Sequence, residues 1–290
     1  MTTPRQRLRE MLQRGDTIVA PGAYDPIGAR VVQSLGFPAV YTGGYITGAH
    51  TTITEPLLTL TDQVEVAQRV ARAIDLPVLA DAGTGFGDPL HVMRCVREFE
   101  KAGIAGIHIE DQVYPKRASY HKGLEHIVPL HEFQERLTYA LRARQDHDFL
   151  LIGRTDAFSA VEGGRDELVR RGLALQELGV DAVMPRGVRQ KEDLAFFRHA
   201  VPDVPLLVIA GADDISVQEY ADLGYQILIY ATTAIVATVH ALLNTYQRLK
   251  ETGCLNFNAQ QVAEIRTQVE ALIDLPAYYQ LEAETTEKRS

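Results

Sequence analysis

The chain has 290 residues, 46% hydrophobic and 23% charged, a composition that supports a large buried core and excludes wholesale disorder. Its 38 acidic residues against 29 lysines and arginines give a net charge of −9, which argues against nucleic acid or an anionic membrane surface as the main partner. A small anionic metabolite held by a few local arginines is compatible with this charge. No apolar run approaches the ~20 residues of a membrane span, and residues 1–14 lack a signal-peptide pattern, so we expect a cytoplasmic protein.

The two cysteines are too few for a disulfide framework and lack the spacing of a metal site. Cys95 shares one face of an expected helix with Val92, Val96 and Phe99, which predicts a core position for its side chain. Neither Cys95 nor Cys254 is therefore expected to hold a metal.

A helix-to-strand junction recurs along the chain and is its most informative pattern. In each copy a helical stretch ends at a glycine, and an apolar strand begins within a few residues. Glycine suits this place because the residue after a helix commonly takes a positive φ. Four copies indicate parallel strands joined by helices: Leu35-Gly36-Phe37, Ala102-Gly103-Ile104, Leu178-Gly179-Val180 and Leu223-Gly224-Tyr225.

Eight short apolar runs supply the expected strands. They are nearly continuous rather than alternating, as in parallel strands covered on both faces. The runs are residues 17–20, 39–42, 77–80, 106–109, 149–153, 182–184, 205–209 and 226–230. Amphipathic helices are expected between them at residues 62–74, 89–102, 132–144, 165–178, 191–200 and 217–223, and Asp88-Pro89 is a typical helix start.

Eight strands alternating with helices in one ~250-residue unit favour a (β/α)₈ TIM barrel over a doubly wound open sheet. Apolar helical segments at 232–249 and 259–273 exceed what a barrel requires. We expect one domain over residues 1–290, with a C-terminal helical extension from about residue 234 that is exchanged between subunits of a homo-oligomer, a dimer of dimers. The polar residues 282–290 are expected to be frayed.

The carboxyl ends of the strands carry the candidate site residues, because active sites of such barrels lie there. Several carboxylates and two arginines converge on this rim: Tyr24, Asp25, Gly43, Gly44, Tyr45, Asp81, Glu110, Asp111, Arg154, Asp156, Arg186, Gly211, Asp213 and Tyr230.

Some of these acidic residues have structural explanations. Asp25 before Pro26, and the pair Asp213-Asp214, fit helix N-caps, and Asp156 can pair with Arg154. Asp81 and Glu110 instead end strongly apolar strands, where a charge is costly unless it is paired or bound to a metal. These two carboxylates are therefore predicted to be functional.

Two glycine-rich turns differ in what they predict. The run from Asp81 to Gly87 lacks the Lys-Ser/Thr ending of a phosphate loop and the later acidic partner of a dinucleotide site, so nucleotide binding is not expected. Gly43-Gly44 can form a small backbone nest that suits a carboxylate.

Five segments, in this order and on these strand ends, resemble the isocitrate lyase and phosphoenolpyruvate mutase superfamily. They are Tyr41-Thr-Gly-Gly44, Asp81-Ala-Gly-Thr-Gly-Phe-Gly87, His108-Ile-Glu-Asp-Gln112, Pro115-Lys-Arg117 and Gly153-Arg-Thr-Asp-Ala157. The resemblance extends from residue 20 to about residue 253.

The resemblance implies enzymes that bind a 2-oxo or 2-hydroxy acid on Mg²⁺, with Mn²⁺ as an alternative, and stabilise an enolate-like intermediate. By position, Asp81 and Glu110 would anchor the metal, directly or through water. Arg154 would face the developing oxyanion. Gly43, Gly44 and Tyr45 would form a cradle for the carboxylate, with Tyr41 as a further substrate-binding residue. Glu55 falls near a family acidic position. Lys116 and Arg117 begin a mobile loop over the site, and Lys116 is counted among the catalytic residues.

Three positions depart from the family pattern. Ala118 stands where the lyases carry their proton-donating cysteine, Gly83 replaces the second Asp of the metal motif, and Arg186 replaces a glutamate. Tyr120 and His121 are candidate replacement acids. Arg186 either holds a second anionic group, such as a distal carboxylate, or pairs with Glu110 or Asp156. The loop of the phosphonate-handling members is also absent.

The apparatus that remains suits a Mg²⁺-dependent lyase acting on a small 2-oxo or 2-hydroxy (di)carboxylic acid through an enolate, with oxaloacetate-type decarboxylation as the example. Three alternatives stay open. They are aldol-type cleavage of a substituted malate with an acid other than cysteine, phosphonomutase-like chemistry, and a metabolite-binding pseudoenzyme.

Overall fold

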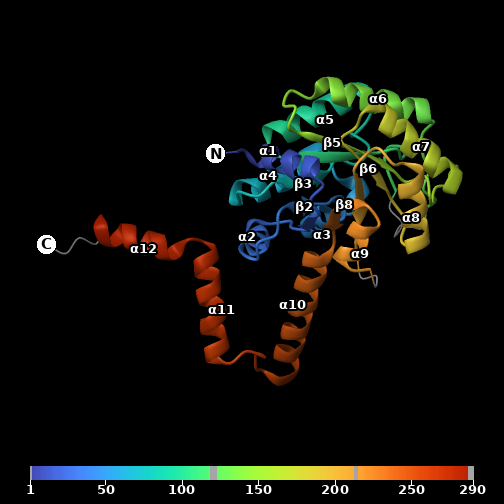
Figure 1. Ribbon diagram of the computed structural model, residues 1–290. Helices are drawn as coiled ribbons and strands as arrows, with labels where there is room; N and C mark the ends of the chain where they lie inside the picture. The colour runs from blue at the N-terminus through green and yellow to red at the C-terminus, as the bar shows by residue number, and fades with distance from the viewer. Residues whose placement is uncertain (1, 118–122, 212–214, 287–290) are drawn as a thin grey trace. The chain divides into compact units, whose positions relative to one another are not determined.

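The structure, a computed structural model, describes residues 2–117, 123–211 and 215–286. Within them the strands form one eight-stranded parallel sheet in the order β1-β8-β7-β6-β5-β4-β3-β2. A single bridge between Gly22 and Tyr41 joins the two outer strands, and the Ala23 N–H donates to the Tyr41 carbonyl oxygen at 2.9 Å. The sheet is therefore a nearly closed barrel surrounded by helices (Figure 1), which confirms the predicted (β/α)₈ fold.

The strands lie close to the predicted runs. They are β1 (Ile18–Pro21), β2 (Val40–Thr42), β3 (Val78–Asp81), β4 (Gly106–Glu110), β5 (Leu150–Thr155), β6 (Ala182–Pro185), β7 (Leu206–Ile209) and β8 (Tyr225–Tyr230). The helices up to β8 are α1 (Pro4–Arg14), α2 (Pro26–Ser34), α3 (Gly44–Thr51), η1 (Glu55–Leu57), α4 (Leu60–Ala73), α5 (Pro89–Lys101), α6 (Leu130–Ala143), α7 (Arg165–Leu178), α8 (Lys191–Ala200) and α9 (Val217–Asp222).

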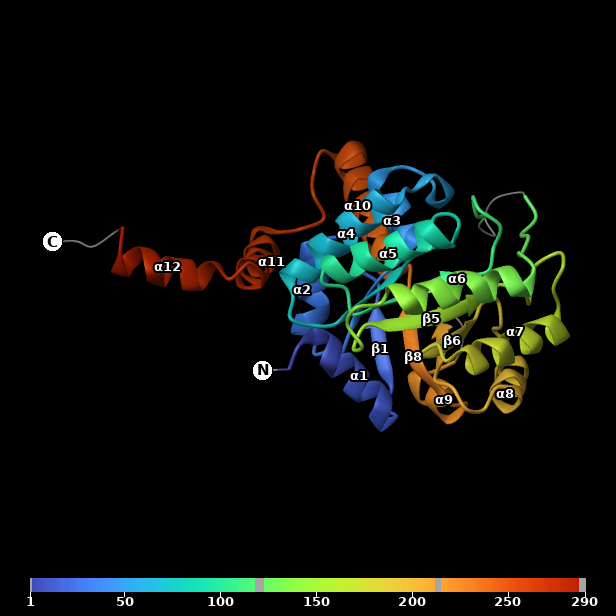
Figure 2. The same ribbon diagram turned by 90° about the horizontal axis from the view of Figure 1, so that it is seen from above.

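Helix α1 lies at the amino-terminal end of the barrel, beside β1 (Figure 2). Its Leu8 and Leu12 pack into the apolar cluster that fills the barrel interior, together with residues such as Leu79 and Leu150. A second, larger cluster lies between the strands and the surrounding helices. With the amino-terminal end filled in this way, the carboxyl ends of the strands carry the site.

The four glycine junctions are confirmed. Gly36, Gly103, Gly179 and Gly224 all have φ between 78° and 84°, the left-handed region that a side chain would disfavour. Two of the predicted caps are also confirmed, because Asp25 accepts a hydrogen bond from the Gly28 N–H and Asp88 accepts from two N–H groups of the first turn of α5.

Five strands end one or two residues later than the sequence predicts, and in three of them the added residues include a candidate site residue. Asp81, Glu110 and Arg154 stay within the ladder, where Asp81 pairs with His108 and Glu110 pairs with Arg154 in register. Apolar periodicity misses these residues because they are polar, although their backbone continues the strand. Helix α3 was not predicted, and a further helix, α12 (Leu275–Glu284), replaces part of the expected frayed end.

The chain divides into two compact units, residues 1–235 and 236–290. Helix α10 (Thr233–Thr252) crosses this boundary, and α11 (Ala259–Leu272) and α12 lie in the second unit. Large apolar side chains of that unit are exposed, among them Val236, Leu243 and Tyr246. The single domain over residues 1–290 and the exchange of the extension between subunits stay predictions. None of the described helices has both the length and the apolar character needed to cross a membrane.

The two cysteines are expected to react at very different rates with a thiol reagent. Cys95 is fully buried, and burial raises the pKa of its thiol well above the usual range, whereas Cys254 is exposed. Ellman's reagent at pH 8 should therefore modify at most one thiol in the native protein and a second only in denaturant. Fast modification of two thiols under native conditions would contradict the core position of Cys95.

Candidate active site

A cavity of about 380 Å³ opens at the carboxyl ends of the strands. Active sites of (β/α)₈ barrels lie at this end. Its polar lining consists of Tyr41, Gly43, Gly44, Tyr45, Glu55, Asp81, Gln112, Lys116, Arg117, Arg154 and Arg186. All five residues predicted to bind substrate line this cavity, together with the predicted catalytic residues Arg154 and Lys116 and the predicted metal ligand Asp81.

Some predicted positions lie elsewhere. Glu110 is fully buried and does not line the cavity, although its carboxylate contacts residues that do. The candidate acids Tyr120 and His121, the thiol position Ala118 and the expected cap Asp213-Asp214 lie outside the described residues.

Two backbone N–H groups fix the carboxylate of Asp81 at the end of β3. The Gly83 N–H donates to Oδ1 at 2.7 Å, and the Gly44 N–H donates to Oδ2 at 3.2 Å. Burial alone would raise the pKa of Asp81, but Lys116, His108 and Arg154 hold it well below its usual range. Asp81 is therefore ionised at neutral pH. One N–H of the expected Gly43-Gly44 nest is already directed at this carboxylate.

Gly44 lies against the side chain of Glu55. A Cβ placed there would overlap Glu55 Oε1, so a larger residue would have to displace the Glu55 carboxylate. Gly44 is also the first residue of α3, whose N-terminal N–H groups favour negative charge. The turn thus combines an acidic side chain with a backbone able to face an anion.

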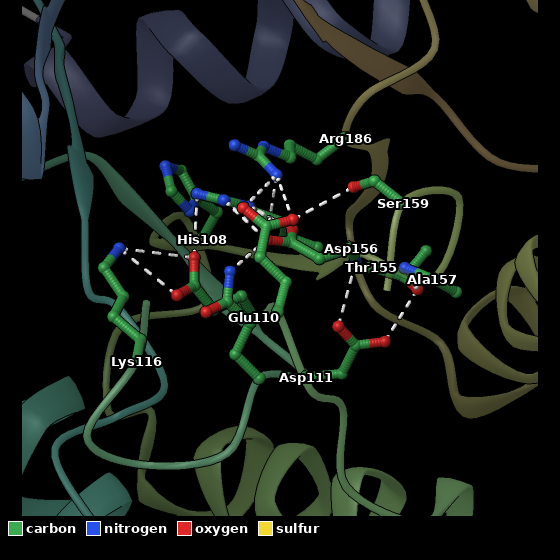
Figure 3. Close-up of polar contacts among 12 residues, drawn as sticks. His108, Glu110, Asp111, Lys116, Thr155, Asp156, Ala157, Ser159 and Arg186 are labelled. Carbon is green, nitrogen blue, oxygen red and sulfur yellow. Dashed lines mark hydrogen bonds and ion pairs between the residues drawn. The ribbon is translucent and has the colours of Figure 1, made fainter. Parts of the chain in front are cut away.

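The ammonium group of Lys116 lies among three carboxylates. Its Nζ is 3.2 Å from Glu110 Oε1 (Figure 3). It is also 2.6 Å from Glu55 Oε1 and 3.7 Å from Asp81 Oδ2. Burial opposes the charge on Lys116, but Asp81, Glu110 and Glu55 raise its pKa well above the usual range. A positive charge attached to the chain therefore lies at the carboxylates predicted to hold the metal.

These carboxylates fit a hard divalent cation such as Mg²⁺, which binds oxygen ligands and retains several waters. Glu110 Oε1 accepts no hydrogen bond from any described residue, and burial raises the pKa of this carboxyl to about 7 against the attraction of Arg154 and Lys116. Among the described residues, no group of three or more His, Cys, Asp or Glu side chains is arranged as a complete metal site. Asp81 and Glu110 would therefore hold the cation with water completing its coordination.

Replacing Lys116 by methionine is expected to strengthen divalent-cation binding. A cation held by Asp81 and Glu110 would share these carboxylates with Lys116, so removing the ammonium charge would remove a competitor and leave buried negative charge uncompensated. Calorimetric titration with Mn²⁺ or Mg²⁺, without substrate, should show about tenfold tighter binding, equivalent to ~1.4 kcal/mol. The neighbouring variant Arg117→Met should leave the affinity nearly unchanged. Equal or weaker binding by Lys116→Met would contradict the competition.

Arg154, at the end of β5, is clamped on two sides. Its Nε and Nη2 donate to Asp156 at 2.7 and 2.9 Å, and its Nη1 lies 2.8 Å from Glu110 Oε2. Burial would lower the pKa of Arg154, but Asp156 and Glu110 raise it well above the usual range. Asp156 is ionised as well, because Arg154 lowers its pKa to about 2 against the opposing effect of burial. The predicted Arg154–Asp156 pair is thus confirmed, and it presents a fixed guanidinium to the cavity.

Arg186 pairs mainly with a residue that the sequence did not select. Its Nη1 lies 2.8 and 2.7 Å from the two Glu125 carboxylate oxygens, and Ser159 Oγ donates to Glu125 Oε2 at 3.0 Å. Asp156 Oδ2 is further away, at 3.9 Å. Of the two ion-pair partners expected for Arg186, Asp156 is a distant one, and the closest carboxylate is that of Glu125. Figure 3 shows Arg186 on the same side of the site as Ser159.

Behind the cavity, Tyr41 and His108 form a buried polar pair. The Tyr41 hydroxyl lies 2.8 Å from His108 Nε2, and the two rings are stacked with centroids 5.8 Å apart. Burial lowers the pKa of His108 to about 4, so the ring is neutral at neutral pH. The side chain of Tyr41 thus faces His108 at the level of Asp81, whose Oδ1 lies 3.9 Å from His108 Nδ1.

Sequence reasoning missed Gln112, Glu125 and Ser159 as parts of this site. The Gln112 side chain donates to Asp156 and accepts from the Arg117 N–H, so it links two sides of the cavity. Gln112 lies within a recognised motif, which was a usable signal. Glu125 and Ser159 lie in loops, and their sequence context carries no comparable signal.

An eight-stranded parallel barrel whose carboxyl end brings buried carboxylates, a clamped arginine and a glycine turn to one cavity is the architecture of a (β/α)₈-barrel enzyme. The profile of the Phosphoenolpyruvate phosphomutase family matches residues 8–250. The chain belongs to this family, within the isocitrate lyase and phosphoenolpyruvate mutase superfamily. The prediction of an enzyme of the carbon–carbon lyase class is confirmed.

Characterised relatives and solved structures match most of the chain. The 2,3-dimethylmalate lyase of Eubacterium barkeri is 37% identical over 250 residues, 84% of this chain and 85% of that protein. A structure of oxaloacetate acetylhydrolase with the inhibitor 3,3-difluorooxalacetate has a TM-score of 0.89 and 27% identity, covering 98% of this chain and 97% of the other. Phosphonopyruvate hydrolase in complex with oxalate and Mg²⁺ has a TM-score of 0.85 and 27% identity, covering 98% and 100%. Each relative is named for a small carboxylic acid.

Proposed function

We propose that the chain is a Mg²⁺-dependent lyase that cleaves a carbon–carbon bond in a small 2-oxo or 2-hydroxy dicarboxylic acid through an enolate, with oxaloacetate decarboxylation as the example. The observation that carries this proposal is the convergence of ionised Asp81 and clamped Arg154 on one cavity, with the Glu110 carboxylate in contact with Arg154. The hard oxygen donors of the carboxylates match Mg²⁺, and the arginines match an anionic substrate.

The residues at the cavity have defined roles in such a reaction. Gly43 and the adjoining Tyr45 line the cavity and face the substrate carboxylate, while the Gly44 N–H holds Asp81, which binds the cation together with Glu110. When bound, Mg²⁺ polarises the 2-oxo oxygen and stabilises the negative charge that develops there.

Bond cleavage then depends on Arg154. As the bond between C3 and C4 breaks and carbon dioxide leaves, the electron pair moves toward the C2 oxygen. Arg154 stabilises this developing oxyanion without rearranging, because Asp156 and Glu110 already hold its guanidinium. A proton then adds at C3 to give pyruvate. Tyr120 and His121 stay candidate donors of that proton, with solvent as the alternative.

The relatives support this choice of chemistry. Oxaloacetate acetylhydrolase and phosphonopyruvate hydrolase are both named for 2-oxo acids, and the latter binds oxalate with Mg²⁺. Oxalate has the shape and charge of the enolate that pyruvate forms. A cavity of about 380 Å³ is ample for an acid of this size.

The proposal is tested by following pyruvate release from oxaloacetate with Mg²⁺ and with excess EDTA, for the wild type and for Asp81→Ala. Wild-type enzyme with Mg²⁺ should exceed the rate of free Mg²⁺ alone, and both EDTA and Asp81→Ala should abolish the excess. A wild-type rate no greater than that of free Mg²⁺ would overturn oxaloacetate decarboxylation as the activity.

A second candidate activity is aldol-type cleavage of a substituted malate. A further cavity of about 600 Å³ adjoins the first and shares Arg186, Ile209, Ala231 and Thr232 with it. Val188, Val208 and Ala210 add apolar lining, which leaves room for an alkyl-substituted substrate. The similarity to 2,3-dimethylmalate lyase supports the same reading. Appearance of a 2-oxo acid from 2,3-dimethylmalate, without pyruvate release from oxaloacetate, would favour this candidate. A phosphonomutase-like activity would instead interconvert phosphonopyruvate and phosphoenolpyruvate.

The partners in this proposal are a small anionic metabolite and further copies of the chain. The second unit exposes a series of large apolar side chains, including Leu243, Tyr246 and Leu281, which a subunit interface would cover. Light scattering coupled to gel filtration should give the mass of a tetramer, a dimer of dimers. A monomer at micromolar concentration would contradict this assembly.

A further inference from the structure

Behind Arg154, on the side away from the cavity, lies a buried polar network centred on Asp111. Its Oδ2 accepts from Thr155 Oγ1 at 2.7 Å and from Arg171 Nη1 at 3.0 Å, and its Oδ1 accepts from the Asp156 N–H at 2.9 Å. Asp111 is fully buried, directly after β4 (Figure 3). The carboxylate thus grips both residues that follow Arg154 in the chain.

Arg171 closes the network from helix α7. It is 3% exposed, and its other donors go to Glu167 Oε1 at 2.6 Å and to the Val128 carbonyl oxygen at 2.7 Å. Neither Arg171 nor Asp111 lines the cavity. Neither charge is therefore placed to contact the substrate directly.

The buried charges of this network are costly to bring together. Asp111 and Asp156 are two buried carboxylates on adjoining segments, linked by the hydrogen bond from the Asp156 N–H to Asp111 Oδ1. Fixing two like charges so close together is costly unless each is paired. Arg154 pairs with Asp156, and Arg171 pairs with Asp111. The result is two ion pairs between α7 and the cavity, Arg171–Asp111 and Asp156–Arg154, with the two carboxylates next to each other.

We propose that Asp111 and Arg171 are positioning residues that set the direction of the Arg154 guanidinium through Asp156. The Asp156 backbone is held by Asp111, and the Asp156 carboxylate holds two nitrogens of Arg154. A shift of Asp111 would therefore move the atoms that aim Arg154 at the developing oxyanion. This inference rests on the proposed function, because the role of Arg154 in stabilising an enolate comes from there.

Four variants test the network. Asp111→Asn keeps the shape of the side chain and removes its charge, Arg171→Met removes the partner, and the double variant removes both charges so that neither is left buried alone. Arg171→Lys restores the charge without the guanidinium fork. Glu100→Gln is the matched control. Glu100 is a buried carboxylate at the C-terminal end of α5, and it accepts hydrogen bonds from the Gln145 and Asp146 N–H groups. It does not line the cavity.

Each variant is assayed for kcat and KM on the substrate that the wild type turns over, and for calorimetric affinity for oxalate in the presence of Mg²⁺. We expect Asp111→Asn, Arg171→Met and the double variant to lower kcat by about 100-fold with KM little changed, as for a misplaced group that acts in the transition state. Oxalate affinity should fall with kcat because oxalate mimics the enolate. Arg171→Lys should recover part of kcat.

The double variant separates positioning from stability. It should unfold at nearly the wild-type denaturant concentration while keeping the loss of kcat and of oxalate affinity. Recovery of kcat in the double variant, or an equal loss in Glu100→Gln, would show a purely structural role and overturn the inference. A wild-type protein with neither turnover nor Mg²⁺-dependent oxalate binding would instead overturn the proposed function.

Discussion

Replacing Arg154 by methionine is expected to lower kcat by about 100- to 1,000-fold, the usual cost of removing one preorganised donor to a developing oxyanion. Arg154 is the cationic group that Asp156 and Glu110 hold at the cavity, and its guanidinium is fixed before the reaction begins. Circular dichroism and steady-state kinetics on the same preparation would separate loss of activity from loss of fold.

Arg154→Lys is the informative companion to this variant. Lysine keeps the positive charge but cannot donate to Asp156 through two nitrogens while a third faces Glu110. We therefore expect kcat in Arg154→Lys to stay well below that of the wild type. Wild-type kcat in either variant would show that this arginine does not stabilise the transition state.

Replacing Arg186 by glutamine is expected to raise KM for oxaloacetate by about 10- to 100-fold, because a charge-assisted hydrogen bond contributes ~1.5–3 kcal/mol. Arg186 lines both adjoining cavities and is held by Glu125, so its guanidinium is placed to meet the carboxylate distal to the 2-oxo group. Inhibition by pyruvate should change little, since pyruvate lacks that carboxylate.

Arg189→Gln serves as the matched control. Arg189 is an exposed arginine on the same loop, and it lines the cavity of about 600 Å³ but not the cavity of about 380 Å³ that contains Asp81 and Arg154. It should leave KM for oxaloacetate near the wild-type value. An equal rise in both variants would point to a general loss of positive charge rather than to recognition by Arg186.

The barrel was predictable because its signals are local. Each glycine junction needs a positive φ at one residue, and each strand is an apolar run of a few residues, so neighbours in sequence carry the information. The same logic located Asp81, Glu110 and Arg154, because a charge at the end of an apolar strand points to the rim of a barrel.

The contacts among those charges were not predictable, because they join residues far apart in the chain. Lys116 and Glu55 are 61 positions apart in sequence, and so are Arg186 and Glu125. Arg171, on helix α7, pairs with Asp111, which is 60 positions earlier and follows β4. Their pairing depends on how loops and helices pack over the barrel. The sequence therefore indicates most members of the site, but not Glu125 and Ser159, the carboxylate partners of Lys116 or the network behind Arg154.

The most direct test of this account is calorimetric titration of oxalate into the protein with saturating Mg²⁺, repeated in EDTA and with Asp81→Ala. In the proposed site, Asp81 and Glu110 hold the cation and Arg154 faces the small anion, so all three residues contribute to oxalate binding. We expect the wild type to bind oxalate in the presence of Mg²⁺, and we expect this binding to be lost both in EDTA and in Asp81→Ala. Oxalate binding of equal strength in EDTA, or in Asp81→Ala with Mg²⁺, would contradict it.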